Sequence, residues 1–207
     1  MTRVKICGIR SLDEALAASR LGAWAIGEVF APSPRRIEID RAAAINRELN
    51  SGIIKVGVFV NEDVDELKRI ARISKLDIIQ VHGEEPPEYL EEIDLPLIKA
   101  FSLKGPVEPE GLRRWPAWAY LFDTSSPGVK GGSGRTFNWQ WLEAIKGWRN
   151  MILAGGLNED NVFRAINRVR PMAVDVSSGV EFSQGGKDPE KVSNFIQKVK
   201  EADADVS

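Results

Sequence analysis

Cysteine and histidine are nearly absent from this chain of 207 residues, which holds one of each, Cys7 and His82. A single cysteine excludes an intramolecular disulfide. A single histidine excludes a histidine-rich metal site and makes a Ser-His-Asp hydrolase an unfavourable interpretation. Chemistry in this chain therefore falls to carboxylates, lysines, arginines, Cys7, His82 or backbone dipoles.

A charge excess and a long apolar run are also missing. Lysine and arginine number 28 against 30 aspartates and glutamates, a net charge of −2, so no basic field indicates a nucleic-acid partner. No apolar run approaches the roughly 20 residues of a membrane helix, and the N-terminus lacks a signal pattern. The composition, 43% hydrophobic and 28% charged, is that of an ordinary globular protein. We expect a cytoplasmic enzyme.

The chain repeats one unit eight times: a short β-branched run, a Gly/Pro/polar turn and an amphipathic stretch. The repeat predicts a single-domain (β/α)8 TIM barrel over residues 1–207, with no linker dividing it. A doubly wound open sheet is the alternative, although no G-x-G-x-x-G motif follows the first strand. The expected strands are residues 3–7, 24–30, 54–60, 77–81, 97–101, 119–123, 151–154 and 173–177.

Helix signals lie between these strands. Ser11 followed by Glu14 is a capping box, and Asn61 is expected to cap a later helix in the same way. The proline-rich stretch 102–118 is only weakly helical. The helix after Asn61 is expected to bury one face, formed by Leu67, Ile70 and Ile73.

Two strand ends carry chemistry, and active sites of such barrels lie at the C-terminal ends of the strands. Cys7 ends the first strand before Gly8, and Asp123 ends the sixth before a glycine-rich loop. If they face one another, they form an acid/base pair across one pocket. A nearby positive charge would favour the thiolate form of Cys7, but Lys5 is too close in sequence to show whether it supplies that charge. The alternatives are a buried structural cysteine and a loop-fixing aspartate. The loop suggests a lid over substrate, formed by Gly131, Gly132, Ser133 and Gly134.

Two glycine-containing loops after the seventh and eighth strands indicate an anion site. Gly155 and Gly156 lead toward a helix, so backbone N–H groups and the helix dipole can face an anion. Ser177, Ser178 and Gly179 add hydroxyl and backbone donors. Taken alone, Gly155 and Gly156 are better explained as a tight strand-to-helix turn, but the two loops together favour phosphate by analogy with other barrels.

Four further side chains lie near strand ends. Arg35 is able to bind a carboxylate through two hydrogen bonds, the alternative being a surface arginine. His82 is as well explained by a structural hydrogen bond as by a role in a site. Gln80 and Asp175 belong to the same set of strand ends.

In this order the motifs resemble those of the phosphoribosylanthranilate isomerases, (β/α)8 enzymes of tryptophan biosynthesis. The resemblance spans nearly the whole chain and is carried by segments 4–9, 33–35, 56–61, 80–84, 122–124, 131–134, 137–139, 154–158 and 174–181. It implies an Amadori rearrangement of N-(5-phospho-β-D-ribosyl)anthranilate to 1-(2-carboxyphenylamino)-1-deoxyribulose 5-phosphate, with neither cofactor nor metal. The implied partner is a small phosphosugar, bound by a monomer or a homodimer.

The resemblance also implies roles for the site residues. Asp123 is the expected general acid at the furanose ring oxygen, and Cys7 is the expected base for the C2′ proton. Arg35 would hold the anthranilate carboxylate, and the two glycine loops would hold the phosphate. Three more candidates would position the substrate: Gln80, His82 and Asp175.

Glu28 departs from the family pattern, which usually has phenylalanine there. We expect it to face solvent, a subunit contact or a paired cation, because burying a lone carboxylate is costly. The alternative functions are another phosphosugar isomerase or epimerase, an indole-glycerol-phosphate synthase, and a non-catalytic phosphosugar-binding barrel. The enzymatic alternatives need a metal-binding His/Asp set or a catalytic Lys/Glu pair at strand ends, and we can place neither. A non-catalytic barrel would lack the acid or the base, whereas this sequence has both Asp123 and Cys7.

Overall fold

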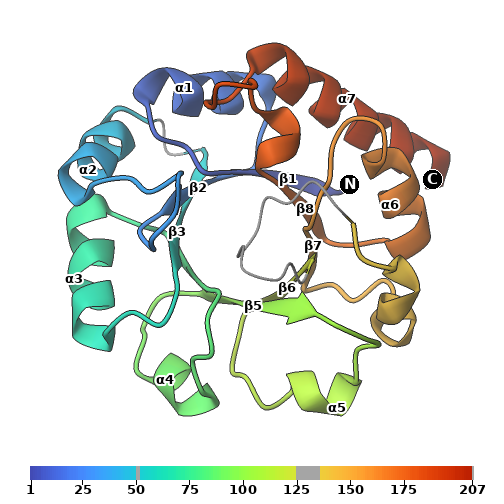
Figure 1. The fold of residues 1–207 in the computed structure, drawn as a ribbon, viewed down its shortest axis with the longest axis horizontal. Helices are drawn as coiled ribbons and strands as arrows, with labels where there is room; N and C mark the ends of the chain where they lie inside the picture. The colour runs from blue at the N-terminus through green and yellow to red at the C-terminus, as the bar shows by residue number, and fades with distance from the viewer. Residues whose placement is uncertain (50–51, 125–135, 207) are drawn as a thin grey trace.

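A computed structural model describes residues 1–49, 52–124 and 136–206 of the chain. Parallel strands pair in chain order into a closed barrel, in which β8 returns to β1 (Figure 1). The strands are β1 (Arg3–Cys7), β2 (Ala25–Val29), β3 (Ile54–Phe59), β4 (Ile78–Val81), β5 (Leu97–Leu103), β6 (Ala119–Thr124), β7 (Met151–Leu153) and β8 (Ala173–Val176). The barrel predicted from the sequence is therefore confirmed.

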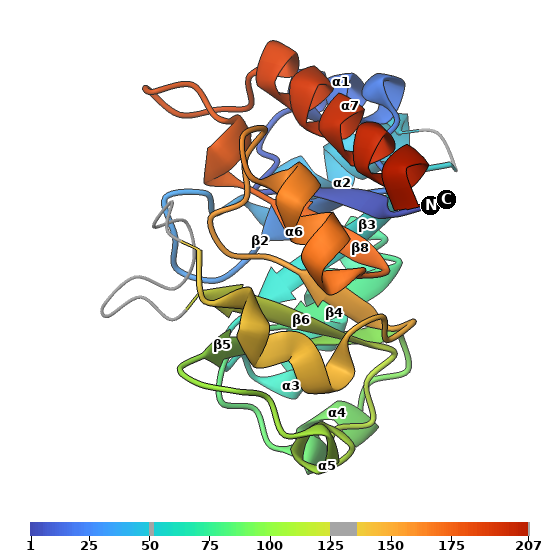
Figure 2. The same cartoon turned by 90° about the vertical axis from the view of Figure 1, so that its right-hand side faces the viewer.

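Helices cover the outside of the barrel, and α1 and α7 lie side by side (Figures 1 and 2). The helices are α1 (Leu12–Leu21), α2 (Ile39–Glu48), α3 (Val64–Ser74), α4 (Pro87–Glu91), α5 (Pro109–Leu112), α6 (Val162–Val169) and α7 (Pro189–Val206). Two 3₁₀ helices add to them, η1 (Trp139–Ile145) and η2 (Ser178–Val180). The brevity of α5 agrees with the weak helical pattern of residues 102–118. No helix in the described ranges is long and apolar enough to cross a membrane.

Capping side chains determine where two of these helices begin. Ser11 caps α1, as predicted, by accepting a hydrogen bond from the amide of Glu14. The predicted cap at Asn61 is wrong, since Asp63 accepts the amide hydrogen bonds at the start of α3. Asn61 instead accepts from the amide of Glu84 and so ties the end of β3 to the loop after β4.

The helical face predicted for α3 is correct in two of its three residues. Leu67 and Ile70 are buried, whereas Ile73 is exposed. A spacing of three residues falls short of the 3.6 residues of a helical turn, so a third residue in the series rotates away from the face.

Glu28 lies where the sequence did not predict it. Its side chain alternates with the inward-facing Gly27, so it points toward the helices, and it is fully buried. Its Oε2 atom accepts a 2.9 Å hydrogen bond from Asn46, which also donates to the carbonyl of Ser74. Burial raises the pKa of Glu28 to about 7, against the opposing effect of Asn46. The expectation that Glu28 faces solvent, a subunit contact or a paired cation is wrong, because a carboxyl group with a raised pKa and an amide donor can be buried within the chain.

Candidate active site

A cavity of about 380 Å³ opens at the C-terminal ends of the strands and gathers most of the predicted site residues. Its lining includes Cys7, Arg35, Gln80, His82, Asp123, Gly155, Gly156, Asp175, Ser177 and Ser178. Gly179 does not line it. The predicted lid residues Gly131, Gly132, Ser133 and Gly134 lie outside the described residues.

Asp123 is buried at the end of β6. Its Oδ1 atom accepts a 2.6 Å hydrogen bond from the amide of Thr124, and its Oδ2 atom lies 3.8 Å from His82 Nε2. Burial raises the pKa of Asp123 to about 6, and the nearby Asp175 carboxylate adds to this, against the Thr124 hydrogen bond. Asp123 therefore has a substantial protonated fraction at weakly acidic pH, as a general acid requires.

His82 and Gln80 face the same cavity from β4 and the loop after it. Burial lowers the pKa of His82 to about 4, so its contact with Asp123 at neutral pH is not an ion pair. His82 Nε2 and Gln80 Oε1 are buried and have no hydrogen-bond partner within the described ranges. Two unpartnered polar atoms in a cavity wall are suited to a polar ligand.

Cys7 lies across the barrel on β1. Burial raises the pKa of its thiol, partly opposed by the positive charge of Lys5. Lys5 is itself fully buried, and its Nζ atom donates to Asp175 Oδ1 at 2.6 Å. Sequence reasoning left Lys5 without a role, although strand alternation places residues 5 and 7 on one face.

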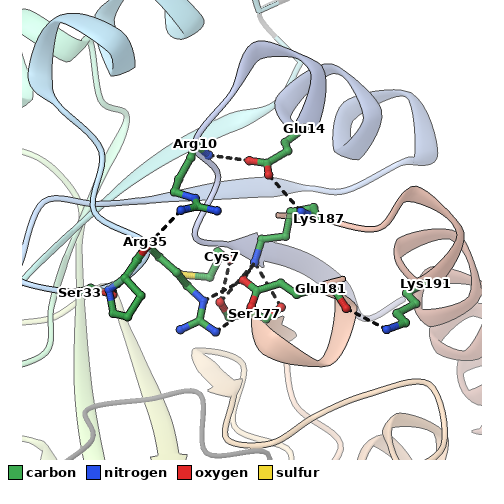
Figure 3. A network of polar contacts seen from close by, with 10 residues as sticks. Cys7, Arg10, Glu14, Ser33, Arg35, Ser177, Glu181, Lys187 and Lys191 are labelled. Atoms are coloured by element: carbon green, nitrogen blue, oxygen red, sulfur yellow. Dashed lines mark hydrogen bonds and ion pairs between the residues drawn. The ribbon is translucent and has the colours of Figure 1, made fainter. Parts of the chain in front are cut away.

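A network of ion pairs surrounds Arg35 (Figure 3). Its Nε and Nη2 atoms donate to the two carboxylate oxygens of Glu181, both at 2.8 Å. Lys187 Nζ donates to Glu181 Oε1 at 2.7 Å and also reaches the carbonyl and hydroxyl oxygens of Ser177. Burial alone would raise the pKa of Glu181, but hydrogen bonds from Arg35 and Lys187 outweigh it and lower the pKa to about 2. Sequence reasoning missed Lys187, and it gave Glu181 no role within segment 174–181.

The two glycine loops lie against each other. Gly155 and Gly156 have φ angles of 86° and 64°, in the left-handed region that favours glycine. The sequence predicts that the two glycines lead into a helix whose dipole faces the anion. That helix, α6, begins only at Val162, so these glycines do not form its N-terminus. Gly179 packs against the carbonyl of Leu157, where an added Cβ atom would overlap it. Gly179 therefore lies where the two glycine loops pack together rather than in the cavity wall.

A closed (β/α)8 barrel with a thiol, a carboxyl group and two glycine loops around one cavity at this end has the layout of a barrel enzyme. Residues 4–198 match the family model of N-(5'phosphoribosyl)anthranilate (PRA) isomerase. The isomerase of Syntrophomonas wolfei is 60% identical over 97% of this chain and 98% of its own length. That of Desulforudis audaxviator is 48% identical over 98% and 100%. The chain belongs to the phosphoribosylanthranilate isomerase family.

Solved structures agree with this assignment. The isomerase of Thermus thermophilus is 39% identical, with a TM-score of 0.87 over 97% of this chain and 99% of that one. A further isomerase structure, solved with reduced 1-(o-carboxyphenylamino)-1-deoxyribulose 5-phosphate, is 37% identical with a TM-score of 0.82, covering 97% of this chain and 100% of that one. The family, fold and isomerase activity predicted from the sequence are therefore confirmed.

Proposed function

We propose that this chain converts N-(5-phospho-β-D-ribosyl)anthranilate to 1-(2-carboxyphenylamino)-1-deoxyribulose 5-phosphate by general acid/base catalysis. Family membership supports the reaction. The observation that carries the mechanism is that Cys7 and Asp123, on opposite sides of the barrel, line one cavity. A relative 37% identical to this chain has been solved with a reduced form of the product.

The first step falls to Asp123. Its protonated carboxyl group donates a proton to the furanose ring oxygen, and the bond between that oxygen and C1′ breaks. The nitrogen lone pair forms a C1′=N double bond, giving a protonated Schiff base and an Asp123 carboxylate. The raised pKa of Asp123, caused first by burial, increases the fraction able to donate at neutral pH.

The second step falls to the Cys7 thiolate. It removes the C2′ proton, which the adjacent protonated imine has made acidic. The C–H electrons form a C1′=C2′ double bond and neutralise the nitrogen, leaving an enolamine that tautomerises to the ketone. A modest base is sufficient for such a proton, so a thiolate suits the task.

Binding falls to the rest of the cavity. Arg35 is proposed to hold the anthranilate carboxylate, because its Glu181 partner engages only one edge of the guanidinium. The phosphate is assigned to the backbone N–H groups and hydroxyls of the two glycine loops. Three residues are proposed to position the sugar: Gln80, His82 and Asp175.

Assembly and location remain predictions for this chain. A solved relative from Thermotoga maritima is described as monomers generated from a dimeric isomerase. For this chain we propose a monomer or a homodimer in the cytoplasm, acting on a small phosphosugar.

The test is turnover by the purified protein. We expect it to consume the substrate, followed by loss of anthranilate fluorescence, with no added metal or cofactor. Binding of the substrate without consumption would favour the non-catalytic barrel and overturn the proposal. Consumption to a different phosphosugar product would favour another isomerase.

A further inference from the structure

Lys5 and Cys7 converge on one small space inside the barrel. The two residues are two positions apart on β1, so their side chains lie on the same face of the strand and point into the barrel. Gly27 is the register partner of Cys7 on β2. A Cβ atom built on Gly27 would lie 2.8 Å from Cys7 Sγ and 3.0 Å from Lys5 Nζ. The missing side chain of Gly27 therefore leaves room for the ammonium group and the sulfur to approach each other.

We propose that Lys5 is a positioning residue whose buried ammonium group donates a hydrogen bond to Cys7 Sγ and stabilises the thiolate. The use of that thiolate as the C2′ base rests on the function proposed above. The stabilisation itself is a property of the free protein and can be measured without substrate.

Two other cations near the thiol, Lys187 and Arg35, are held by oxygen acceptors. Lys187 Nζ, from the segment after η2, donates to Glu181 and to two oxygens of Ser177. Arg35, from the loop after β2, donates to Glu181 through two N–H groups. An ammonium group has three donors, and the hydrogen bond of Lys5 to an oxygen within the described ranges is the one to Asp175. Lys5 thus has donors to offer the sulfur.

Asp175 on β8 completes the arrangement. It is the register partner of Lys5, 2.6 Å from Nζ. Burial would lower the pKa of Lys5, but the charges of Asp175 and Cys7 outweigh it and raise that pKa, so the lysine stays charged. The Asp175 charge also raises the pKa of Cys7, and the Lys187 charge lowers it. Two further titratable groups line the cavity on other strands or loops, Asp123 and His82.

Alkylation by iodoacetamide provides the test, because Cys7 is the single cysteine and the reagent reacts with the thiolate. We expect Lys5→Met to move the pH midpoint of alkylation upward by about one unit or more, which is roughly a tenfold slower reaction at pH 8. Lys5→Arg, which retains the charge, should restore part of the difference. Comparing midpoints rather than single rates separates ionisation of the thiol from access to it.

The matched control is Lys99→Met. Lys99 is also buried and forms a 2.6 Å pair with Glu85, but it lies on β5. Its loss should leave the alkylation midpoint unchanged. If Lys5→Met does not fold by circular dichroism, Lys5→Gln removes the charge, retains a donor for Asp175, and should give the same upward shift.

An unchanged midpoint in a folded Lys5→Met or Lys5→Gln protein would overturn the inference, as would an equal shift in Lys99→Met. The proposed reaction fails separately, when the wild-type protein does not consume substrate. We expect the folded Lys5 variants to lose kcat with a smaller change in KM, because Lys5 acts through Cys7 rather than on the substrate.

Discussion

Arg35 and Glu181 are joined by two hydrogen bonds of 2.8 Å, from Nε to Oε1 and from Nη2 to Oε2. These bonds use two of the five N–H donors of the guanidinium, along one edge. Lys187 holds Glu181 through the same Oε1 atom. The arginine is therefore oriented before substrate arrives, and its other edge is suited to a second carboxylate.

Replacement of Arg35 by alanine should mainly weaken substrate binding. A hydrogen-bonded carboxylate contact contributes about 1.5–3 kcal/mol, so we expect KM to rise roughly 10- to 100-fold with a smaller change in kcat. Steady-state kinetics by anthranilate fluorescence measure both constants. Arg36→Ala is the matched control, since Arg36 is exposed and does not line the cavity. An unchanged KM in Arg35→Ala would remove the carboxylate contact from the proposal.

Replacement of Cys7 or Asp123 by alanine should abolish most of the turnover. Each change removes a proton-transfer group, whose contribution is about 10²–10⁴-fold. Asp123→Asn is the sharper variant, because its side-chain oxygen can still accept the Thr124 hydrogen bond. Circular dichroism should show a folded protein in each case. Near-normal kcat in a variant would exclude the assigned role for that residue.

The pH dependence of kcat/KM should be bell-shaped. Burial, with the charge of Asp175, raises the pKa of Asp123 to about 6, and burial raises the pKa of Cys7 above its ordinary value. The reactive form pairs a protonated Asp123 with a Cys7 thiolate, the minor tautomer of the singly protonated pair. Its population is therefore constant between the two pKa values. Activity should rise through pH 6 and fall only above the thiol pKa. The residual activity of Asp123→Asn should instead rise only as Cys7 ionises and should show no fall at higher pH.

The sequence predicts the site residues that local patterns mark, and misses those whose role depends on a partner far away along the chain. Cys7 and Asp123 are visible because each ends an apolar run, and the barrel rule then brings strand ends together. Lys5 is not visible in the sequence in this way. A lysine inside a barrel is unfavourable unless a carboxylate pairs with it, and its partner Asp175 lies 170 positions away along the chain. Strand alternation could have placed both Lys5 inward and Glu28 outward.

The pair of Glu181 and Lys187 shows the second limit. These residues meet through the path of the segment after η2, and no periodic pattern encodes that path. Glu28 shows a third, since its raised pKa follows from burial beneath other elements, opposed by an amide from Asn46 on α2. Sequence periodicity predicts strands and the faces of their side chains, whereas protonation states follow from contacts between elements.

Gly179→Ala should disturb the proposed phosphate site. An added Cβ atom would overlap the carbonyl oxygen of Leu157 and lie 3.1 Å from Asn158 Cα, so the two glycine loops would have to move apart. We expect a loss of about 1–3 kcal/mol in the free energy of unfolding, with a higher KM for the substrate. Urea denaturation and fluorescence kinetics measure the two effects. Gly105→Ala is the control, because a Cβ atom there meets nothing within 4 Å. A variant with unchanged stability and KM would contradict the tight packing of the loops.

Glu28 should make the stability of the protein fall as pH rises toward neutrality. Burial raises its pKa to about 7 in the folded chain, against a value of 4.5 when exposed, so between these pH values the folded state binds more protons than the unfolded one. The free energy of unfolding therefore decreases over this window, by about 3 kcal/mol from this group, and is level above it.

Glu28→Gln removes the ionisable group, and its side-chain oxygen can still accept the hydrogen bond from Asn46. Urea denaturation at pH 5 and pH 8 should show a gain in stability for the variant over wild type that is larger at pH 8. Using the difference between the two proteins cancels other titrating groups, such as Asp123. Glu48→Gln, an exposed change at the end of the neighbouring α2, should track wild type at both pH values. A difference that does not depend on pH would mean that Glu28 is ionised in the folded protein throughout this range.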